Sequence, residues 1–126
     1  MKGVLIDSDI LIEVSRARNH AILARWAELG PSDTALFCSP VTLVELWHGV
    51  KPREVSFLSA LFLAIQCIPI DAEIGVLAGT YLSQFAKSHH LELGDALIAA
   101  TASAHNLELW TQNRKHYPMK AITFFQ

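Results

Sequence analysis

The sequence lacks an apolar run that is long enough to cross a bilayer. A membrane-spanning helix needs about 20 apolar residues, and the most continuous apolar stretch covers only residues 57–65. Residues 1–14 are partly apolar, but Asp7 and Asp9 interrupt them and no small-residue cleavage site follows, so we expect no secretory signal peptide. The protein is therefore expected to be cytoplasmic and to have no membrane partner.

The sequence is also poor in cysteine and in charge. Its two cysteines, Cys38 and Cys67, lack metal-ligand spacing and fall in predicted strands, which predicts reduced thiols in the core. Charged residues make up 17% of the chain and the net charge is −2, which argues against a broadly basic nucleic-acid-binding surface. The hydrophobic share of 52% is high for a small monomer, and it favours a homodimer or a partner that covers part of the surface.

Several short apolar segments are predicted to be buried strands. They are residues 3–6, 35–38, 67–70, 107–110 and 121–125. None of them alternates cleanly between apolar and polar residues, as expected for a parallel sheet that is covered on both faces.

Helical patterns separate these segments. They cover residues 9–14, 21–29, 40–49, 54–65, 71–87 and 94–105. Ser39 and Asp71 are predicted N-caps, and Pro40 suits the first position of a helix. Strands that alternate with helices predict an α/β sandwich with right-handed crossovers, formed by a single domain of residues 1–126.

Polar residues follow two of the predicted strands. Asp7 and Asp9 come directly after the first strand, and Thr111 and Asn113 follow the fourth. Ligands bind outside the carboxyl ends of the strands in an open parallel sheet, so we expect these side chains to meet at one edge. Asp7 or Asp9 would also serve as an ordinary helix cap, and Asn113 as an ordinary turn residue.

Two further acids belong to predicted helices. Asp95 precedes the small apolar residues 96–102, which predicts a helix packed closely on the sheet with Asp95 near the first strand. Glu45 lies in the apolar stretch 41–46, where a carboxylate must face water, a cation or a metal ion. The ordinary alternatives are a helix-dipole interaction for Asp95 and a solvated helix edge for Glu45.

If these acids share a pocket, their repulsion needs a counter-charge. Two carboxylates about 4 Å apart repel by roughly 4 kcal/mol at an effective dielectric of about 20. Three carboxylates in one pocket require a bound proton or a cation. A ligand set made only of oxygen atoms favours Mg²⁺ or Mn²⁺ over zinc.

Four segments resemble the motifs of one family. They are VLIDSDILI at residues 4–12, SPVTLVEL at 39–46, LGDALIAATA at 93–102 and LWTQNRKHY at 109–117. In this order, and over nearly the whole chain, they are similar to the motifs of PIN-domain ribonucleases, specifically the VapC-type toxins of type II toxin–antitoxin systems. The resemblance implies a PIN-like three-layer α/β/α sandwich with a central parallel sheet, and metal-dependent hydrolysis of RNA phosphodiester bonds.

The resemblance also implies catalytic roles for four residues. Asp7, Glu45 and Asp95 fall on the family's metal-binding acids, with Mg²⁺ or Mn²⁺ as the expected cofactor. Asn113 falls where many PIN nucleases have an aspartate, and this change leaves the number of metal ions open.

Neighbouring residues are expected to support this site or to bind the substrate. Asp9 and Thr111 fall at positions that support the acids in the family. Arg114, Lys115 and Lys120 follow the fourth motif with no acid among them. They are expected either to form a solvated loop or to bind the phosphates of RNA.

The resemblance further implies a small cognate antitoxin protein as a partner, in addition to the RNA substrate. The helix predicted over residues 54–65 is apolar nearly all round. Its outer stripe therefore needs cover from the rest of the domain, a homodimer mate or an antitoxin helix.

Three other functions fit parts of the sequence. A PIN-like domain would bind RNA or a partner without cleavage, although the three metal-binding acids are intact. A small haloacid-dehalogenase-like phosphatase would use Asp7 as nucleophile and Asp9 as general acid, but Leu11 replaces its usual Thr or Val. A phospho-receiver domain would need a lysine in the last loop, and the nearest candidate, Lys120, precedes the final predicted strand.

Overall fold

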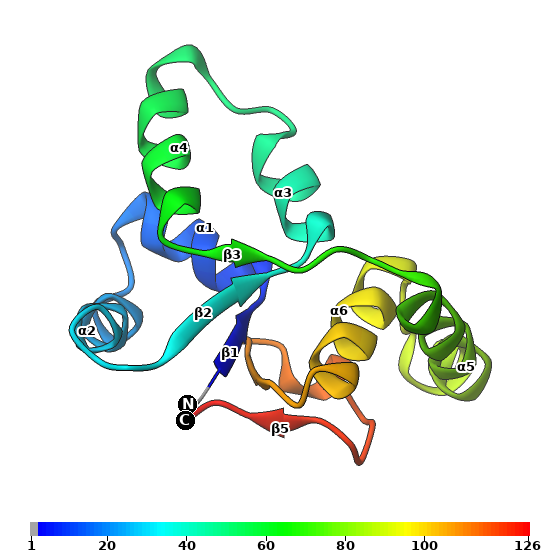
Figure 1. The fold of residues 1–126 in the computed structure, drawn as a ribbon. Helices are drawn as coiled ribbons and strands as arrows, with labels where there is room; N and C mark the ends of the chain where they lie inside the picture. Colours follow the sequence, from blue (N-terminus) through cyan, green and yellow to red (C-terminus); the bar gives the residue numbers. More distant parts are fainter. Residues whose placement is uncertain (1–2) are drawn as a thin grey trace.

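The computed structural model describes residues 3–126, and within this range five strands form one parallel sheet in the order β3-β2-β1-β4-β5 (Figure 1). The strands are β1 (Gly3–Ile6), β2 (Ala35–Cys38), β3 (Gln66–Cys67), β4 (Glu108–Trp110) and β5 (Thr123–Phe124). Met1 and Lys2, which belong to the predicted domain of residues 1–126, lie outside the described residues.

Helices and short 3-10 turns connect the strands. They are α1 (Ser8–Arg16), α2 (His20–Leu29), α3 (Pro40–Trp47), η1 (Pro52–Glu54), α4 (Val55–Leu63), α5 (Ala72–His89), α6 (Leu93–Ala104) and η2 (Arg114–His116). Helices α1 and α2 lie on one side of the sheet and α5 and α6 on the other (Figure 1), which confirms the predicted three-layer α/β/α fold. Across residues 3–126, no helix combines the length and apolar character that a membrane span requires.

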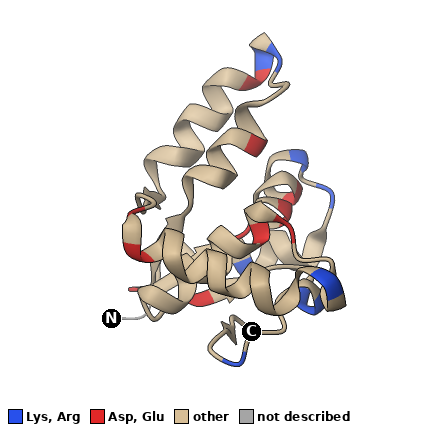
Figure 2. Cartoon of the chain, turned by 90° about the vertical axis from the view of Figure 1, so that its right-hand side faces the viewer, with Lys and Arg blue, Asp and Glu red and all other residues tan. Residues whose placement is uncertain are grey.

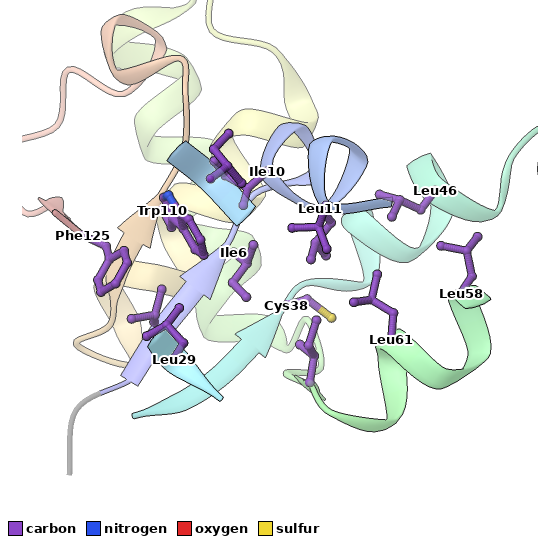
Figure 3. Packing of buried hydrophobic residues seen from close by; sticks show 14 residues of the cluster. Ile6, Ile10, Leu11, Leu29, Cys38, Leu46, Leu58, Leu61, Trp110 and Phe125 are labelled. Atoms are coloured by element: carbon purple, nitrogen blue, oxygen red, sulfur yellow. The ribbon is translucent and has the colours of Figure 1, made fainter. Parts of the chain in front are cut away.

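The sheet separates two hydrophobic cores, and β1 contributes to both. Val4 and Ile6 belong to one core and Leu5 to the other, because successive side chains of a strand point to opposite faces. The first core also contains Ile10 and Leu11 from α1 (Figure 3), together with residues of α2, α3 and α4. The second is built mainly by α5 and α6. Both faces of the sheet are therefore covered, which explains why its strands do not alternate between apolar and polar residues.

The strand order reverses at β1. The chain runs from β1 outward to β2 and β3, and then returns to β4 on the opposite side of β1. Such a reversal opens a crevice at the carboxyl ends of the two central strands, where parallel α/β sheets bind ligands. The Asp7 N–H donates to the Trp110 carbonyl over 2.9 Å and holds the ends of β1 and β4 together at this crevice.

Among the described residues, polar side chains cap the starts of α1, α2, α3 and α5. The predicted N-caps Ser39 and Asp71 are confirmed, because each side chain accepts a backbone N–H from the first turn of its helix, at 3.1 Å and 3.0 Å respectively. Pro40 occupies the first position of α3, where its missing N–H leaves no acceptor unsatisfied. Asp7 caps α1, so this helix begins at Ser8 and not at the predicted residue 9.

Strand β3 is shorter than the strand predicted over residues 67–70. It covers only Gln66–Cys67. The Ile68 N–H still donates to the Cys38 carbonyl over 2.9 Å. Pro69 then has no N–H to donate, so the ladder stops.

Helix α4 is also shorter than the predicted helix over residues 54–65, and a separate 3-10 turn precedes it. Leu58 and Leu61 are buried, whereas Leu63 is 89% exposed and Phe57 is 42% exposed. The rest of the domain therefore covers only one stripe of this apolar helix.

The two cysteines lie opposite each other on β2 and β3. Cys38 and Cys67 are register partners, and both thiols are free, as predicted. Burial, and next the neighbouring thiol, raises the pKa of Cys38 to about 12. The Cys38 thiol therefore stays protonated and behaves as a core residue.

A pair of leucines tests the assignment of the core. Leu5 is fully buried at the centre of the sheet, so Leu5→Ala should lower the free energy of unfolding by about 2–5 kcal/mol. Leu63→Ala should change it by less than about 0.5 kcal/mol, because this side chain is exposed. Urea denaturation followed by circular dichroism measures both values. Equal losses for the two variants would contradict the assignment.

Candidate active site

Asp7 lies directly after β1, at the carboxyl ends of β1 and β4, and is only 8% exposed. Its Oδ1 accepts a hydrogen bond from the Ser8 N–H at 2.7 Å. Its Oδ2 accepts from the Thr111 hydroxyl at 2.9 Å and from the Tyr117 hydroxyl at 2.8 Å. Donors from both ends of the chain therefore fix both oxygens of this buried carboxylate.

Asp9, in the first turn of α1, is held by the loop that follows β4. Its Oδ2 accepts from the Gln112 N–H at 2.9 Å and from the Asn113 side-chain amide at 3.1 Å, and the Thr111 hydroxyl lies 3.4 Å away. Its Oδ1 is buried and has no hydrogen-bond partner among residues 3–126. The predicted residues Asp9, Thr111 and Asn113 thus form one connected group.

Asp95 reaches the same group from α6. This helix packs a row of buried small residues against the sheet, including Ala96, Ala99 and Ala100. The Asp95 Oδ1 lies 3.5 Å from the Tyr117 hydroxyl, which itself contacts Asp7. A single hydroxyl therefore stands between the two carboxylates.

Glu45 joins the group through Ser8. The Ser8 hydroxyl donates to Glu45 Oε1 over 2.6 Å and lies 3.3 Å from the Thr42 hydroxyl, while its backbone N–H binds Asp7. Glu45 itself is exposed on α3. Glu45 is therefore exposed to solvent, as expected for the edge of a helix, and is also linked to the other acids through Ser8, as expected for a residue of the site.

The sequence led us to expect that the acids would share one pocket, but the structure connects them through intervening hydrogen-bond donors. Within residues 3–126, no three side chains of His, Cys, Asp or Glu are close enough to form a ready-made metal-binding group. Ser8 lies between Asp7 and Glu45, binding Asp7 through its N–H and Glu45 through its hydroxyl, and the Tyr117 hydroxyl lies between Asp7 and Asp95. These neutral donors lower the repulsion that three adjacent carboxylates would suffer.

The site nevertheless carries poorly compensated negative charge. Burial, and next the charge of Asp7, raises the pKa of Asp9 to about 6. Burial also raises the pKa of Asp95, with a smaller contribution from Asp7, while the Glu92 backbone N–H and His116 act in the opposite direction. Burial and the charge of Asp7 raise the pKa of Tyr117 well above its ordinary value, so its hydroxyl keeps its proton and remains a donor.

The residues of this site fit a hard divalent cation. Every side-chain ligand on offer is an oxygen, from Asp7, Asp9, Glu45 and Asp95, and this donor set suits Mg²⁺ or Mn²⁺. The buried Asp9 Oδ1 without a hydrogen-bond partner and the raised pKa values of Asp9 and Asp95 are the features that a positive charge would relieve.

The predicted basic residues do not form one group at the acids. Arg114 donates to the Phe125 carbonyl over 3.2 Å, so its guanidinium is turned toward the C-terminal strand. Lys115 is exposed in η2, two residues after Asn113. The structure does not bring Lys120 to the site, because it precedes β5 and lies beside α5 at the amino ends of the strands. Figure 2 shows Lys and Arg scattered over several loops and helix ends, without a continuous basic face in that view.

Two residues at the centre of the site were not singled out from the sequence. Tyr117 and Ser8 lie inside the quoted motifs, yet neither was given a role. The signal for Ser8 is its place between two acids at the start of a helix. Tyr117 offered no such signal, because it reaches Asp7 only through the turn η2, which the sequence did not predict.

Known proteins share both the sequence pattern and the fold. The family profile of the PIN domain matches residues 4–121. Ribonuclease VapC10 of Mycobacterium tuberculosis is 35% identical over 117 residues, which cover 92% of this chain and 86% of that protein. Ribonuclease VapC19 of the same organism is 31% identical over 116 residues, which cover 91% and 92% respectively. The crystal structure of VapBC2 from Rickettsia felis, bound to a promoter DNA fragment, matches with a TM-score of 0.81 at 23% identity, over 98% of this chain and 97% of that chain.

The raised pKa of Asp9 predicts a pH-dependent cost in stability. Asp9 titrates near 3.8 when unperturbed and at about 6 in the fold. The folded state therefore binds the proton more tightly, and the stability that protonated Asp9 provides is lost as the pH rises between these values. In chelator, Asp9→Asn should raise the melting temperature relative to the parent more at about pH 7 than at about pH 4, where Asp9 is protonated.

Thermal melts of the parent and Asp9→Asn across this pH range give the comparison. Asp33→Asn, at an exposed acid between α2 and β2, is the matched control and should show no such trend. If the difference in melting temperature between Asp9→Asn and the parent stayed constant with pH, the buried environment assigned to Asp9 would be contradicted.

Proposed function

This chain belongs to the PIN-domain family and groups with the VapC ribonucleases, and from that premise we propose that it is a metal-dependent ribonuclease that hydrolyses RNA phosphodiester bonds. The observation that carries the proposal is the meeting of Asp7, Asp9 and Asp95 at the carboxyl ends of β1 and β4. These acids come from separate elements, and the pKa values of Asp9 and Asp95 are raised.

Each residue of the site has a separate task in this proposal. Asp7 and Asp95 hold Mg²⁺ or Mn²⁺, and Glu45 adds a third carboxylate that Ser8 orients. Such an ion supplies positive charge against the phosphate and activates water. Asn113 orients Asp9 through its side-chain amide.

The scissile phosphate needs a positive contact beside the acids. Lys115 is exposed and follows Asn113 by two residues, so we assign it to a backbone phosphate of the RNA. Arg114 takes no such role in this proposal, because its side chain is bound to the Phe125 carbonyl. Lys120 takes none either, because it lies at the amino ends of the strands and the acids lie at the carboxyl ends.

The geometry disfavours the phosphatase alternative. The phosphatase would use Asp9 as its general acid, and this role needs a carboxyl group that is free to turn toward the substrate. Here Asp9 Oδ2 accepts hydrogen bonds from the Gln112 N–H and from the Asn113 side-chain amide, so Asp9 is held by the loop after β4.

We further propose that the chain pairs with a small antitoxin protein and forms a homodimer. Large apolar side chains remain exposed on α3 and α4, notably Val44, Phe57 and Leu63. Exposed apolar patches of this kind mark protein interfaces. Solved structures with this fold include a toxin–antitoxin complex from Klebsiella pneumoniae.

Cleavage of RNA by the purified chain tests the catalytic proposal. Asp7→Asn and Asp95→Asn should each reduce the single-turnover rate by more than about 100-fold, because they remove charge that binds the ion. Chelator should abolish cleavage by the parent, and added Mg²⁺ or Mn²⁺ should restore it. Glu73→Gln, at an exposed acid on α5, is the control and should cleave like the parent. Undiminished cleavage by folded Asp95→Asn would show that the reaction occurs elsewhere.

Expression in a bacterial host tests the partner. The chain alone should arrest growth, and co-expression of a cognate antitoxin should restore it. Phe57→Ser and Leu63→Ser should weaken the antitoxin complex in gel filtration, because they remove exposed apolar contacts on α4. Val76→Ser, at an exposed apolar residue on α5, should leave the complex intact. An unchanged complex for both α4 variants would refute this interface.

A further inference from the structure

The Tyr117 side chain is unusual in the site because it is neutral, buried and shared between two acids. Only 3% of the residue is exposed, and its ring belongs to the core formed with α5 and α6. Its hydroxyl lies 2.8 Å from Asp7 Oδ2 and 3.5 Å from Asp95 Oδ1. A tyrosine hydroxyl has one hydrogen to donate, and the shorter distance assigns it to Asp7.

The hydrogen bonds of Asp7 leave its two oxygens unequal. Each carboxylate oxygen has about two lone-pair sites. At Oδ2, both are taken by the hydroxyls of Thr111 and Tyr117. At Oδ1, the Ser8 N–H takes one and leaves the other free.

We propose that Tyr117 is a positioning residue of the cation site: together with Thr111 it closes Oδ2 of Asp7 and leaves Oδ1 as the oxygen through which Asp7 binds a cation. The inference rests on the proposed metal dependence and goes beyond it, because it assigns the mode of ligation. Asp95 Oδ1, which lies 3.5 Å from the hydroxyl and does not receive its hydrogen, stays available.

One-oxygen ligation by Asp7 has a consequence for the choice of cation. Mg²⁺ has a strict octahedral shell of oxygens at about 2.0–2.1 Å, whereas Ca²⁺ accepts six to eight oxygens at about 2.3–2.6 Å and often takes both oxygens of a carboxylate. Mn²⁺ shares the octahedral preference for oxygen ligands. With Oδ2 closed by Tyr117 and Thr111, the site favours Mg²⁺ and Mn²⁺ and disfavours Ca²⁺.

Calorimetric binding of Mn²⁺ and of Ca²⁺ to the whole chain, without RNA, tests this inference. The parent should bind Mn²⁺ more tightly than Ca²⁺. In Tyr117→Phe the ring stays in place but a lone pair of Oδ2 is released, so the preference for Mn²⁺ should fall by about tenfold, as expected from the loss of one hydrogen bond to a charged group.

Two further comparisons separate positioning from a general loss of structure. Thr111→Val removes the other donor to Oδ2 and should also lower the Mn²⁺ preference, whereas Thr111→Ser keeps the hydroxyl and should retain it. Tyr81→Phe is the matched control, because Tyr81 is also buried but its hydroxyl pairs with Ser103 on α6. Circular dichroism establishes that each variant is folded. If Tyr117→Phe does not fold, the comparison of Thr111→Val with Thr111→Ser tests whether the donors to Oδ2 set the Mn²⁺ preference.

The possible results distinguish this inference from the proposed function. An unchanged Mn²⁺ to Ca²⁺ preference in both Tyr117→Phe and Thr111→Val would overturn the positioning role and leave metal-dependent cleavage intact. An equal change in Tyr81→Phe would also overturn it, because the effect would then be structural. A parent that binds neither ion would overturn both the inference and the metal dependence.

Discussion

A buried carboxylate without a counter-ion is tolerated only where donors surround it, and Asp7 is such a group. Its hydrogen bonds reach Ser8, Thr111 and Tyr117, and its backbone N–H binds the Trp110 carbonyl. The start of α1, the end of β4 and the turn η2 all take their positions from these contacts. The loop after β4 must fold back over the sheet edge to supply them.

The same constraint explains the order of the strands. A site between β1 and β4 requires that these strands be neighbours, although about a hundred residues separate them in the chain. The intervening strands β2 and β3 are accommodated on the other side of β1. The small residues of α6 then let this helix pack closely on the sheet and bring Asp95 to the crevice.

The sequence was sufficient for the fold and for the acids, and insufficient for the contacts between them. Apolar segments and helix caps such as Ser39 and Asp71 are local patterns, so they predicted the parallel sheet and its helices. The carboxyl ends of strands meet in any such sheet, which is why Asp7, Asp9, Thr111 and Asn113 converge as expected. The bridging hydroxyl of Tyr117 depends on a turn that no local pattern indicated. The position of Lys120 away from the site could have been predicted, because Lys120 precedes the last strand and therefore lies at the amino ends of the parallel strands.

The site is assembled from residues far apart in order of synthesis. Thr111 and Tyr117 follow Asp7 by 104 and 110 residues respectively. During translation, Asp7 and Asp9 are therefore made long before the residues after β4 that fix them, and β1 lacks its neighbour β4 for most of that time. A nascent chain that stops before η2 carries Asp7, Asp9, Glu45 and Asp95 but lacks Tyr117. The complete site can exist only after Tyr117 has left the ribosome.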